Sequence, residues 1–311
     1  MRRLLALSGA LALFAVGPEA WAAAAVPESA MPWWGWPLSL FIVCFVLGII
    51  AVPAGVGGGV LFVPIVGGFF PFHLDFVRGA GLLVALASAL SAGPALLQSG
   101  LASLRLALPL AVVASASSIL GAMIGFALPT DAVQVALGGT ILAIVLLMAV
   151  AKKSELPEVA APDAISAALG MNGVFVEPNT GRQVPWQVHR TPAGLAVFFF
   201  IGILAGMFGL GAGWANLPAL NLLMGAPLKV SAGTSSFILS LVDSSAAWVY
   251  LNKGAVLPMI AVPSVIGMML GAKIGARLLT VLPAAAVRKL VLGLLAFAGV
   301  RALLKGLGVW L

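Results

Sequence analysis

The residues of this chain that could perform chemistry are few, and they lie within apolar segments. Asp243 is an acidic residue inside the apolar run 231–252, and no other charged residue lies within nine positions of it. Ser236 and Ser240 precede it at positions that share its helix face. An ionisable side chain in a membrane segment is typical of a functional site. Four readings remain open: a protonated or proton-carrying carboxyl, an ion pair with a buried cation such as Lys273, a bound coupling cation, and a structural hydrogen bond.

Two glycine clusters interrupt apolar runs in a similar way. The segments 55-GVGGGVLFVP-64 and 209-GLGAGWANLP-218 each end on a proline. Glycine permits positive φ and a close approach of a ligand, and irregular backbone in a membrane is tolerated only where it is buried in protein or lines a cavity. Free backbone N–H groups at such breaks would suit a small oxyanion. The alternative is that the glycines only permit close helix packing, as we expect for Gly267, Gly271 and Gly275.

The candidate site residues lie in and beside these clusters. The expected substrate-binding residues are Gly57, Gly58, Gly59, Gly211, Gly213, Trp214, Asn216, Thr234, Ser235 and Ser236. The Asn216 amide and the Trp214 indole N–H would donate hydrogen bonds to an anion, or the indole would simply pack. The hydroxyl groups of Thr234, Ser235 and Ser236 would donate to a ligand or form hydrogen bonds between helices. A proton-coupling group or polar stripe is expected from Asp243, Ser240, Ser88 and Ser91.

The composition predicts an all-α, polytopic transmembrane bundle. The chain is 62% hydrophobic and 8% charged, whereas about a quarter of the residues in soluble domains are charged. Its apolar runs reach the ~20 residues that cross a membrane. The net charge of +7 comes from basic residues near the ends of these runs, which indicates membrane orientation and not nucleic-acid binding. With one deep carboxylate and a single cysteine, Cys44, the sequence favours neither an enzyme nor a metal or cofactor site.

Two copies of one unit must position these residues. A shift of 154 residues places 48-GIIAVPAGVGGGVLFVP-64 on 202-GILAGMFGLGAGWANLP-218, and later segments align at shifts of 150 to 154. We therefore predict membrane repeats at 37–151 and 191–311, with broken or re-entrant helices. The expected helical pieces are 37–53, 59–71, 79–99, 104–128 and 131–151, then 192–207, 214–225, 231–252, 255–279 and 284–306.

The segments outside the repeats are shorter. Residues 1–22 are typical of a bacterial secretory signal peptide, with two arginines before an apolar core and a small-residue cleavage site; the alternative is an uncleaved helix. The polar linker 152–190 is predicted to be a cytoplasmic surface loop with a small hairpin at 174–188. A binding role for this linker is the alternative.

Charge indicates how the copies are oriented. If each copy crosses the membrane an odd number of times, nine basic residues lie inside and four outside, namely Arg78, Lys253, Arg301 and Lys305. If each copy crosses an even number of times, five basic residues lie inside and eight outside. The positive-inside rule prefers the odd case, which makes the copies inverted. We expect Lys273 and Arg301, which lie within apolar runs, to extend toward the membrane surface.

The doubled glycine motif, followed by 232-AGTSS-236, resembles the TauE/SafE family of sulfite and sulfonate exporters over roughly 37–151 and 192–306. The resemblance implies a bacterial inner-membrane, multi-pass transporter of sulfur oxyanions or organosulfonates. Its partners would be a small anion and the bilayer, and a homodimer is considered. Asp243 would carry a proton in an alternating-access cycle. The alternatives are an anion channel and a membrane assembly or sensor protein that acts through residues 152–190.

Overall fold

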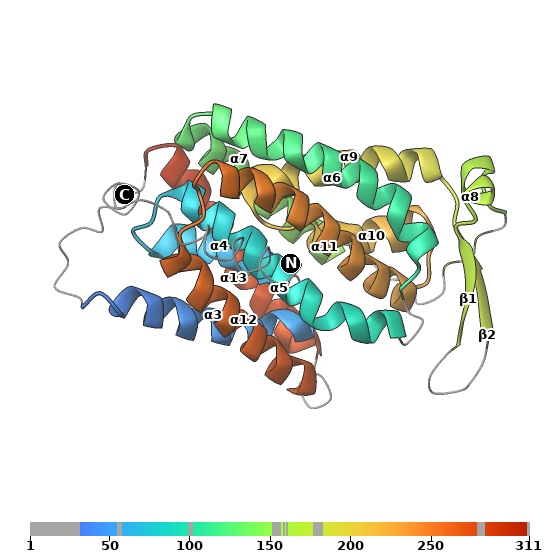
Figure 1. Ribbon diagram of the computed structural model, residues 1–311, viewed down its shortest axis with the longest axis horizontal. Helices are drawn as coiled ribbons and strands as arrows, with labels where there is room; N and C mark the ends of the chain where they lie inside the picture. Colours follow the sequence, from blue (N-terminus) through green and yellow to red (C-terminus); the bar gives the residue numbers. More distant parts are fainter. Residues whose placement is uncertain are drawn as a thin grey trace, which may run out of the picture. The chain divides into compact units, whose positions relative to one another are not determined.

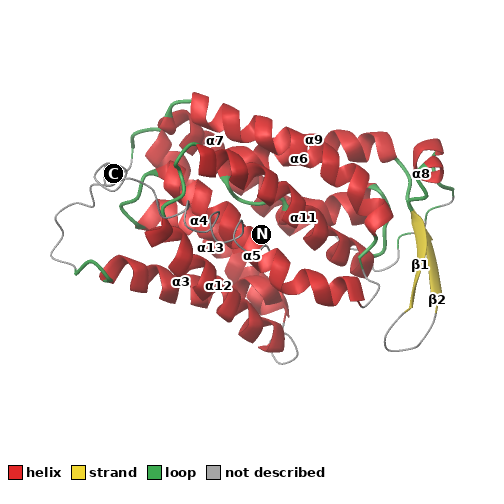
Figure 2. Cartoon of the chain, in the orientation of Figure 1, coloured by secondary structure: helices red, strands yellow, loops and turns green. Residues whose placement is uncertain are grey.

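The helices expected from the apolar runs are present (Figures 1 and 2). The computed structural model describes residues 32–54, 58–98, 102–150, 157, 159, 161–176, 183–278 and 284–309. The first copy contains α3 (Gly35–Ala54), α4 (Gly58–Phe69), α5 (Leu74–Gln98), α6 (Leu104–Ala127) and α7 (Thr130–Val150). The second contains α9 (Thr191–Phe208), α10 (Gly213–Pro218), the π-helix η1 (Ala219–Leu223), α11 (Leu228–Asn252), α12 (Pro258–Leu278) and α13 (Ala284–Gly306). The signal-peptide prediction lies outside the described residues.

The class of the fold is confirmed. Among the described residues, five helices are long and apolar enough to cross a membrane: Leu74–Ser91, Leu104–Ala127, Thr130–Val150, Thr191–Phe208 and Pro258–Gly275. Shorter apolar helices cover Gly35–Ala51 and Gly58–Phe69. Helices that are apolar on every side are typical of membrane spans, because their backbone groups bond within the helix and their side chains meet lipid. The protein is therefore a polytopic helical membrane protein.

Helices of one copy pack on helices of the other in a reciprocal pattern. The first helix of each copy lies along the fourth of the other, since α3 packs on α12 and α9 on α6. The third helices pair with each other, α5 with α11, and so do the fifth helices, α7 with α13. Reciprocal contacts of this kind are what a two-fold relation between two equivalent units produces.

The α3–α12 pair shows how glycines set the distance between helices. Gly267 faces the backbone of Phe41, and Gly275 faces the backbone of Ile49, so the two helices run parallel. A Cβ added to Gly275 would lie 2.7 Å from the carbonyl oxygen of Ile49. Small residues let membrane helices approach this closely, and the packing role expected for these glycines is confirmed.

The α7–α13 pair runs in the opposite sense. Gly138 of α7 faces the backbone of Leu303, whereas Gly306, one turn further along α13, faces Asp131 at the start of α7. Residue numbers rise along one helix as they fall along the other, so these two helices are antiparallel. α7 and α13 are the fifth helices of their copies, so at least this pair of equivalent helices points in opposite directions.

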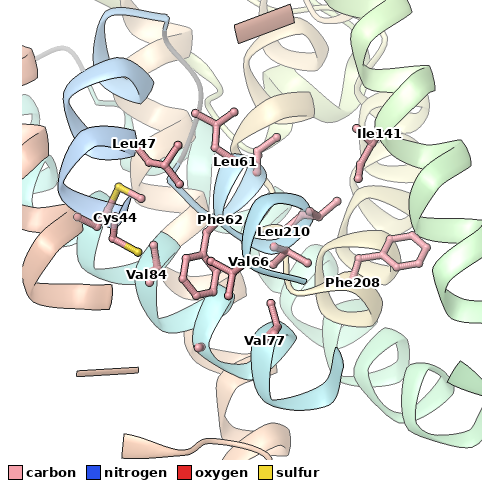
Figure 3. Close-up of a cluster of buried hydrophobic side chains, with 14 of the residues drawn as sticks. Cys44, Leu47, Leu61, Phe62, Val66, Val77, Val84, Ile141, Phe208 and Leu210 are labelled. Atoms are coloured by element: carbon pink, nitrogen blue, oxygen red, sulfur yellow. The ribbon is translucent and has the colours of Figure 1, made fainter. Parts of the chain in front are cut away.

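Helix α4 lies at the centre of a buried apolar cluster. Phe62 and Val66 of this short helix are fully buried and share the cluster with Val77 and Val84 of α5 and with Leu210 (Figure 3). Removing a buried phenylalanine side chain costs about 3–5 kcal/mol. The core thus fixes α4 against α5 and against the glycine segment of the second copy.

The linker is more ordered than a surface loop. It holds α8 (Ala164–Ala168) and two antiparallel strands, β1 (Asn172–Val176) and β2 (Gln183–Gln187). Asp163 accepts hydrogen bonds from the backbone and hydroxyl of Thr191, the first residue of α9, at 3.2 and 2.8 Å. Burial opposes ionisation of this carboxyl, but the hydrogen bonds with Ser166 and Thr191 outweigh it and hold the pKa of Asp163 below its usual 3.8. The linker therefore caps α9.

Candidate functional site

The break in the second copy is a glycine turn between α9 and α10. Gly209 and Gly211 have φ angles of 68° and 73°, a left-handed conformation that glycine adopts without a steric penalty. The chain resumes as α10 at Gly213, and after Pro218 it continues as the π-helix η1. A π-helix within a helical segment frequently lies at a functional site. The expected single piece at 214–225 is thus two short helices.

Gly59, at the described end of the first glycine cluster, lies against the second cluster. A Cβ added to Gly59, in the first turn of α4, would lie 2.7 Å from the carbonyl oxygen of Leu210 and 2.9 Å from the methyl group of Ala85. A Cβ on Gly211 would meet the same methyl group at 3.0 Å. In this conformation, packed atoms fill the space beside these glycines, so here the glycines permit close packing.

Asp243 lies at this junction. Its side chain is fully buried, and a Cβ added to Gly211 would lie 3.1 Å from its Oδ2 atom. Neither carboxylate oxygen has a hydrogen-bond partner among the described residues. The ion pair considered with Lys273 is wrong, because Lys273 is exposed on α12. A buried carboxylate without a partner is costly when ionised, so Asp243 needs a proton or a bound ligand.

Asn216 and Trp214 add further polar atoms without partners. Asn216 is fully buried, and neither Oδ1 nor Nδ2 is hydrogen-bonded. The Nε1 atom of the half-buried Trp214 is also buried and without a partner. Its indole lines an apolar groove of about 490 Å³ together with Phe200, Leu204 and Pro218. Since buried polar groups are rarely left without a hydrogen bond, these atoms are the strongest indication of a ligand in the described part of the chain.

The hydroxyl groups of α11 have other partners. Thr234 Oγ1 accepts a hydrogen bond from the backbone N–H of Ser103 at 3.1 Å, which joins α11 to the N-terminus of α6. Ser236 and Ser240 donate to carbonyl groups of their own helix at 3.2 and 2.8 Å. Ser235 is buried at 6% exposure. The expected polar stripe therefore consists largely of side chains that bond within the helix.

The candidates in the first copy contribute less. Gly57 lies outside the described residues. Gly58 packs on the side chain of Met268, whose sulfur would lie 2.9 Å from an added Cβ. Ser91 is exposed and donates to the carbonyl oxygen of Ser88 at 2.7 Å. The described residues also hold no group of three His, Cys, Asp or Glu side chains that would bind a metal ion.

A buried arginine adjoins the second break. Arg78, which the charge count placed on the outer side, lies inside α5, which begins at Leu74 and not at the expected 79, and it is 2% exposed. Its Nη1 atom donates to the carbonyl oxygens of Met207 at 2.8 Å and Gly125 at 3.2 Å. Its guanidinium also pairs with Asp75. Arg78 thus joins the last turns of α6 and α9.

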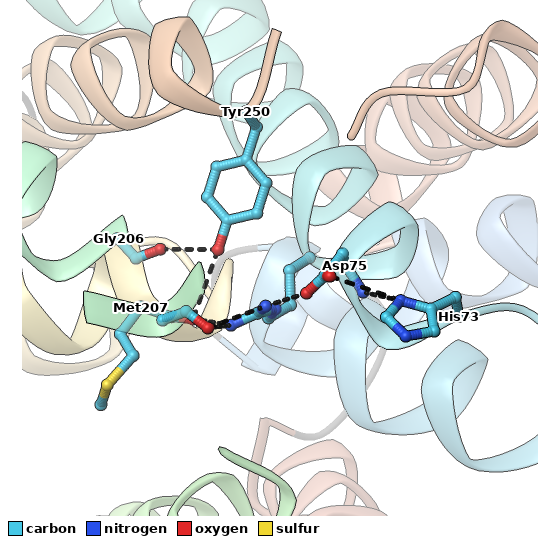
Figure 4. Close-up of polar contacts among 7 residues, drawn as sticks. His73, Asp75, Gly206, Met207 and Tyr250 are labelled. Atoms are coloured by element: carbon cyan, nitrogen blue, oxygen red, sulfur yellow. Dashed lines mark hydrogen bonds and ion pairs between the residues drawn. The ribbon is translucent and has the colours of Figure 1, made fainter. Parts of the chain in front are cut away.

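These carbonyl groups need outside partners because their helices end. The N–H that would bond the carbonyl oxygen of residue 125 in a longer helix is missing, since position 129 is Pro129. The Tyr250 hydroxyl donates to the carbonyl oxygens of Gly206 at 3.0 Å and Met207 at 3.3 Å (Figure 4). Arg78 and Tyr250 therefore close the end of α9 directly before the glycine turn.

The chain is similar to known membrane transport proteins. The family model described as sulfite exporter TauE/SafE matches residues 40–302. The chain is 27% identical over 248 residues to the probable membrane transporter protein YunE of Bacillus subtilis (strain 168), a match that covers 76% of this chain and 87% of that protein. No solved structure matches the chain.

Proposed function

Because the chain belongs to the sulfite exporter TauE/SafE family, we propose that this membrane transporter carries a small sulfur-containing anion, such as sulfite, thiosulfate or an organosulfonate. The proposed location is the bacterial inner membrane, and the proposed mechanism is alternating access between inverted copies.

The observation that carries the proposal is the set of buried polar atoms without partners at the second break. Asn216 Nδ2 and Trp214 Nε1 are hydrogen-bond donors, and the backbone N–H groups after Gly209, whose own N–H is donated to Ala205, would add to them. An oxyanion that accepts these donors recovers the free energy that their burial costs, about 1–3 kcal/mol for each group. The anion therefore binds where Asn216 now has no partner.

In this proposal Asp243 couples the movement of the anion to the movement of a proton. An ionised carboxylate would repel the anion, whereas a protonated carboxyl offers an O–H donor. In the proposed cycle Asp243 is protonated when the anion binds and loses its proton after release. Anion and proton then cross together, which lowers the net charge that is moved through the membrane.

The packing of the fifth helices supports the inverted arrangement. α7 and α13 occupy equivalent places in the two copies and run antiparallel, as Gly138 beside Leu303 and Gly306 beside Asp131 require. Inverted copies with broken helices that meet near the membrane centre are typical of secondary transporters. The close packing of Gly59 on Leu210 corresponds in this proposal to a closed state, and substrate entry requires these segments to separate.

The test is flux in proteoliposomes that contain the purified protein, with sulfite, thiosulfate, sulfate and sulfoacetate at two pH values. We expect saturable flux of at least one of these anions, and we expect this flux to be faster when a proton gradient drives protons in the same direction as the anion. Asn216→Leu should abolish this flux, and Asp243→Asn should remove its pH dependence. The matched controls, Asn252→Ala and Asp131→Asn, change exposed residues and should leave flux unchanged.

Two results would reject the proposal. Flux that does not saturate and does not depend on proton movement in the same direction would indicate a channel. Normal flux in Asn216→Leu, with pH dependence intact in Asp243→Asn, would place the substrate elsewhere.

A further inference from the structure

A cleft of about 690 Å³ lies between the linker hairpin and the end of the helical bundle. Small-molecule sites are typically about 300–1,000 Å³. Its lining includes Arg105 in the first turn of α6, Trp186 and Gln187 of β2, and the loop from Gly225 to Pro227 before α11. This cleft is separate from the glycine breaks, and the transport proposal does not use it.

One wall of the cleft, the linker hairpin, is tied to the bundle at one end. The backbone N–H of His189 donates to the carbonyl oxygen of Met224 at 3.0 Å, and the Ser166 hydroxyl donates to the carbonyl oxygen of Val188 at 3.0 Å. Met171 and Val188 are fully buried in a cluster shared with α6, α9 and α11. The hairpin therefore holds its place against the bundle, and the cleft is part of the folded structure.

The chemistry of the lining is that of an anion site with a flat apolar wall. Arg105 is a charged residue of the lining, and no acidic residue is found in its described part. The Nη1 atom of Arg105 would lie 3.8 Å from a Cβ added to Gly170. The guanidinium forms no hydrogen bond or ion pair with the described residues. Gly173 packs on the indole ring of Trp186, at 3.1 Å for an added Cβ. Arginine recognises carboxylate, sulfonate and phosphate groups, and an indole face packs on flat apolar groups.

We propose that this cleft binds a small organic anion with a flat apolar body, and that its occupant acts on the second glycine break. Arg105 binds the anionic group, and Trp186 packs on the body. Gly225 lies two residues after η1, which continues from the helix that carries Asn216. The Ser103 N–H bonded to Thr234 lies two residues before Arg105. The occupant thus contacts segments that lead directly to the second break.

Calorimetric titration of the purified full-length protein in a neutral detergent tests the binding, with empty micelles as the blank. The probe is benzenesulfonate; benzenesulfonamide has the ring without the charge, and methanesulfonate has the charge without the ring. We expect benzenesulfonate to bind and both analogues to bind at least about tenfold more weakly, and Arg105→Gln to weaken benzenesulfonate by at least about tenfold. Arg190→Gln removes another exposed positive charge next to β2 and should change nothing.

The result that overturns the proposal is equal binding by the Arg105→Gln protein, or equal binding of either analogue. Asn216→Leu separates the two sites, since benzenesulfonate should bind that variant as it binds the wild type. In proteoliposomes, benzenesulfonate on the linker side should change sulfite flux in the wild type and not in Arg105→Gln. This last arm alone rests on the proposed function, and unchanged flux in an active wild type would overturn the action on the break.

Discussion

Replacing Arg78 should destabilise the protein strongly. Arg78→Val introduces the residue that the second copy carries at the equivalent position, Val230, which is also buried. The change removes the Arg78 donors from the carbonyl oxygens of Met207 and Gly125 and the guanidinium from Asp75. Met207 keeps the longer bond from the Tyr250 hydroxyl, at 3.3 Å. The Asp75 side chain is 29% exposed, so the ion pair itself contributes little. Hydrogen bonds from a charged group contribute about 1.5–3 kcal/mol each, so the loss of the bonds to two carbonyl groups costs on the order of 4 kcal/mol, and valine replaces none of the donors.

Part of the stability lost in Arg78→Val comes from contacts between the guanidinium and two aromatic rings. The guanidinium lies 5.5 Å from the ring centre of Phe126 and 5.8 Å from that of Tyr250, contacts worth about 0.5–2 kcal/mol when desolvated. Arg78→Lys keeps the charge and the pair with Asp75, but one ammonium group cannot reproduce the planar set of donors to two separate carbonyl groups. We therefore expect Arg78→Lys to recover only part of the stability.

Thermal unfolding of the detergent-solubilised protein, followed by tryptophan fluorescence, measures the effect. At about 2–4 °C per kcal/mol for a chain of this order of size, a loss of ~4 kcal/mol should lower the Tm of Arg78→Val by about 10 °C. Tyr250→Phe, which removes one hydroxyl donor, should lower it by a few degrees. Lys253→Val, at an exposed position, is the matched control. If Arg78→Val and this control unfold at the same temperature, other groups satisfy the carbonyls and Arg78 does not close the end of α9.

Three further predictions use the same assay. Gly209→Ala should destabilise the protein markedly, because its φ is 68° and the new Cβ would overlap the backbone of Arg78; a stable variant would show that the turn can rearrange. Gly293→Ala should stabilise α13 by about 0.5–1 kcal/mol, since an added Cβ meets no atom within 4 Å, and a loss of stability would contradict the packing described here. Asp163→Ala should destabilise the protein at neutral pH. The pKa of Asp163 is lowered from 3.8 in the folded protein. Its contribution to stability is therefore complete above about pH 4 and is lost as the pH falls through the folded-state pKa. The difference in Tm between the variant and the wild type should shrink in that range.

Much of the architecture could be predicted from the sequence because membrane helices are governed by composition. Long apolar runs leave the backbone no alternative to helix, and the shift of 154 residues reveals the repeat. The bounds were less accurate where glycine lies inside a helix. α5 begins at Leu74 and not at 79, since Gly79 lies in the second turn of that helix, where an added Cβ would overlap the backbone of Ala255.

Partners distant in sequence could not be predicted. Arg78 bonds to carbonyl groups 47 and 129 residues away, and carbonyl acceptors carry no sequence signal. The signals available were Pro129, which leaves a carbonyl of α6 without a donor, and Asp75 three residues before the arginine. The ion pair considered between Asp243 and Lys273 was wrong, because the glycines of α12 face α3 and the Lys273 side chain is exposed.

The two copies share a backbone plan and differ in their polar groups, which has a consequence for the proposed cycle. At the shift of 154 residues, Asn216 corresponds to Phe62, which is fully buried in the apolar core. The arginine that closes the end of α9 has Val230 as its counterpart, and valine has no side-chain donor. The unpartnered polar atoms of the proposed site therefore come from the second copy, whereas Gly59 and Ala85 of the first copy pack on the glycine turn before them. A helix end held by several charge-assisted bonds moves less readily than one held by apolar contacts alone. We therefore expect the start of α4 to move away from the second break when the site opens, while the end of α9 keeps its place.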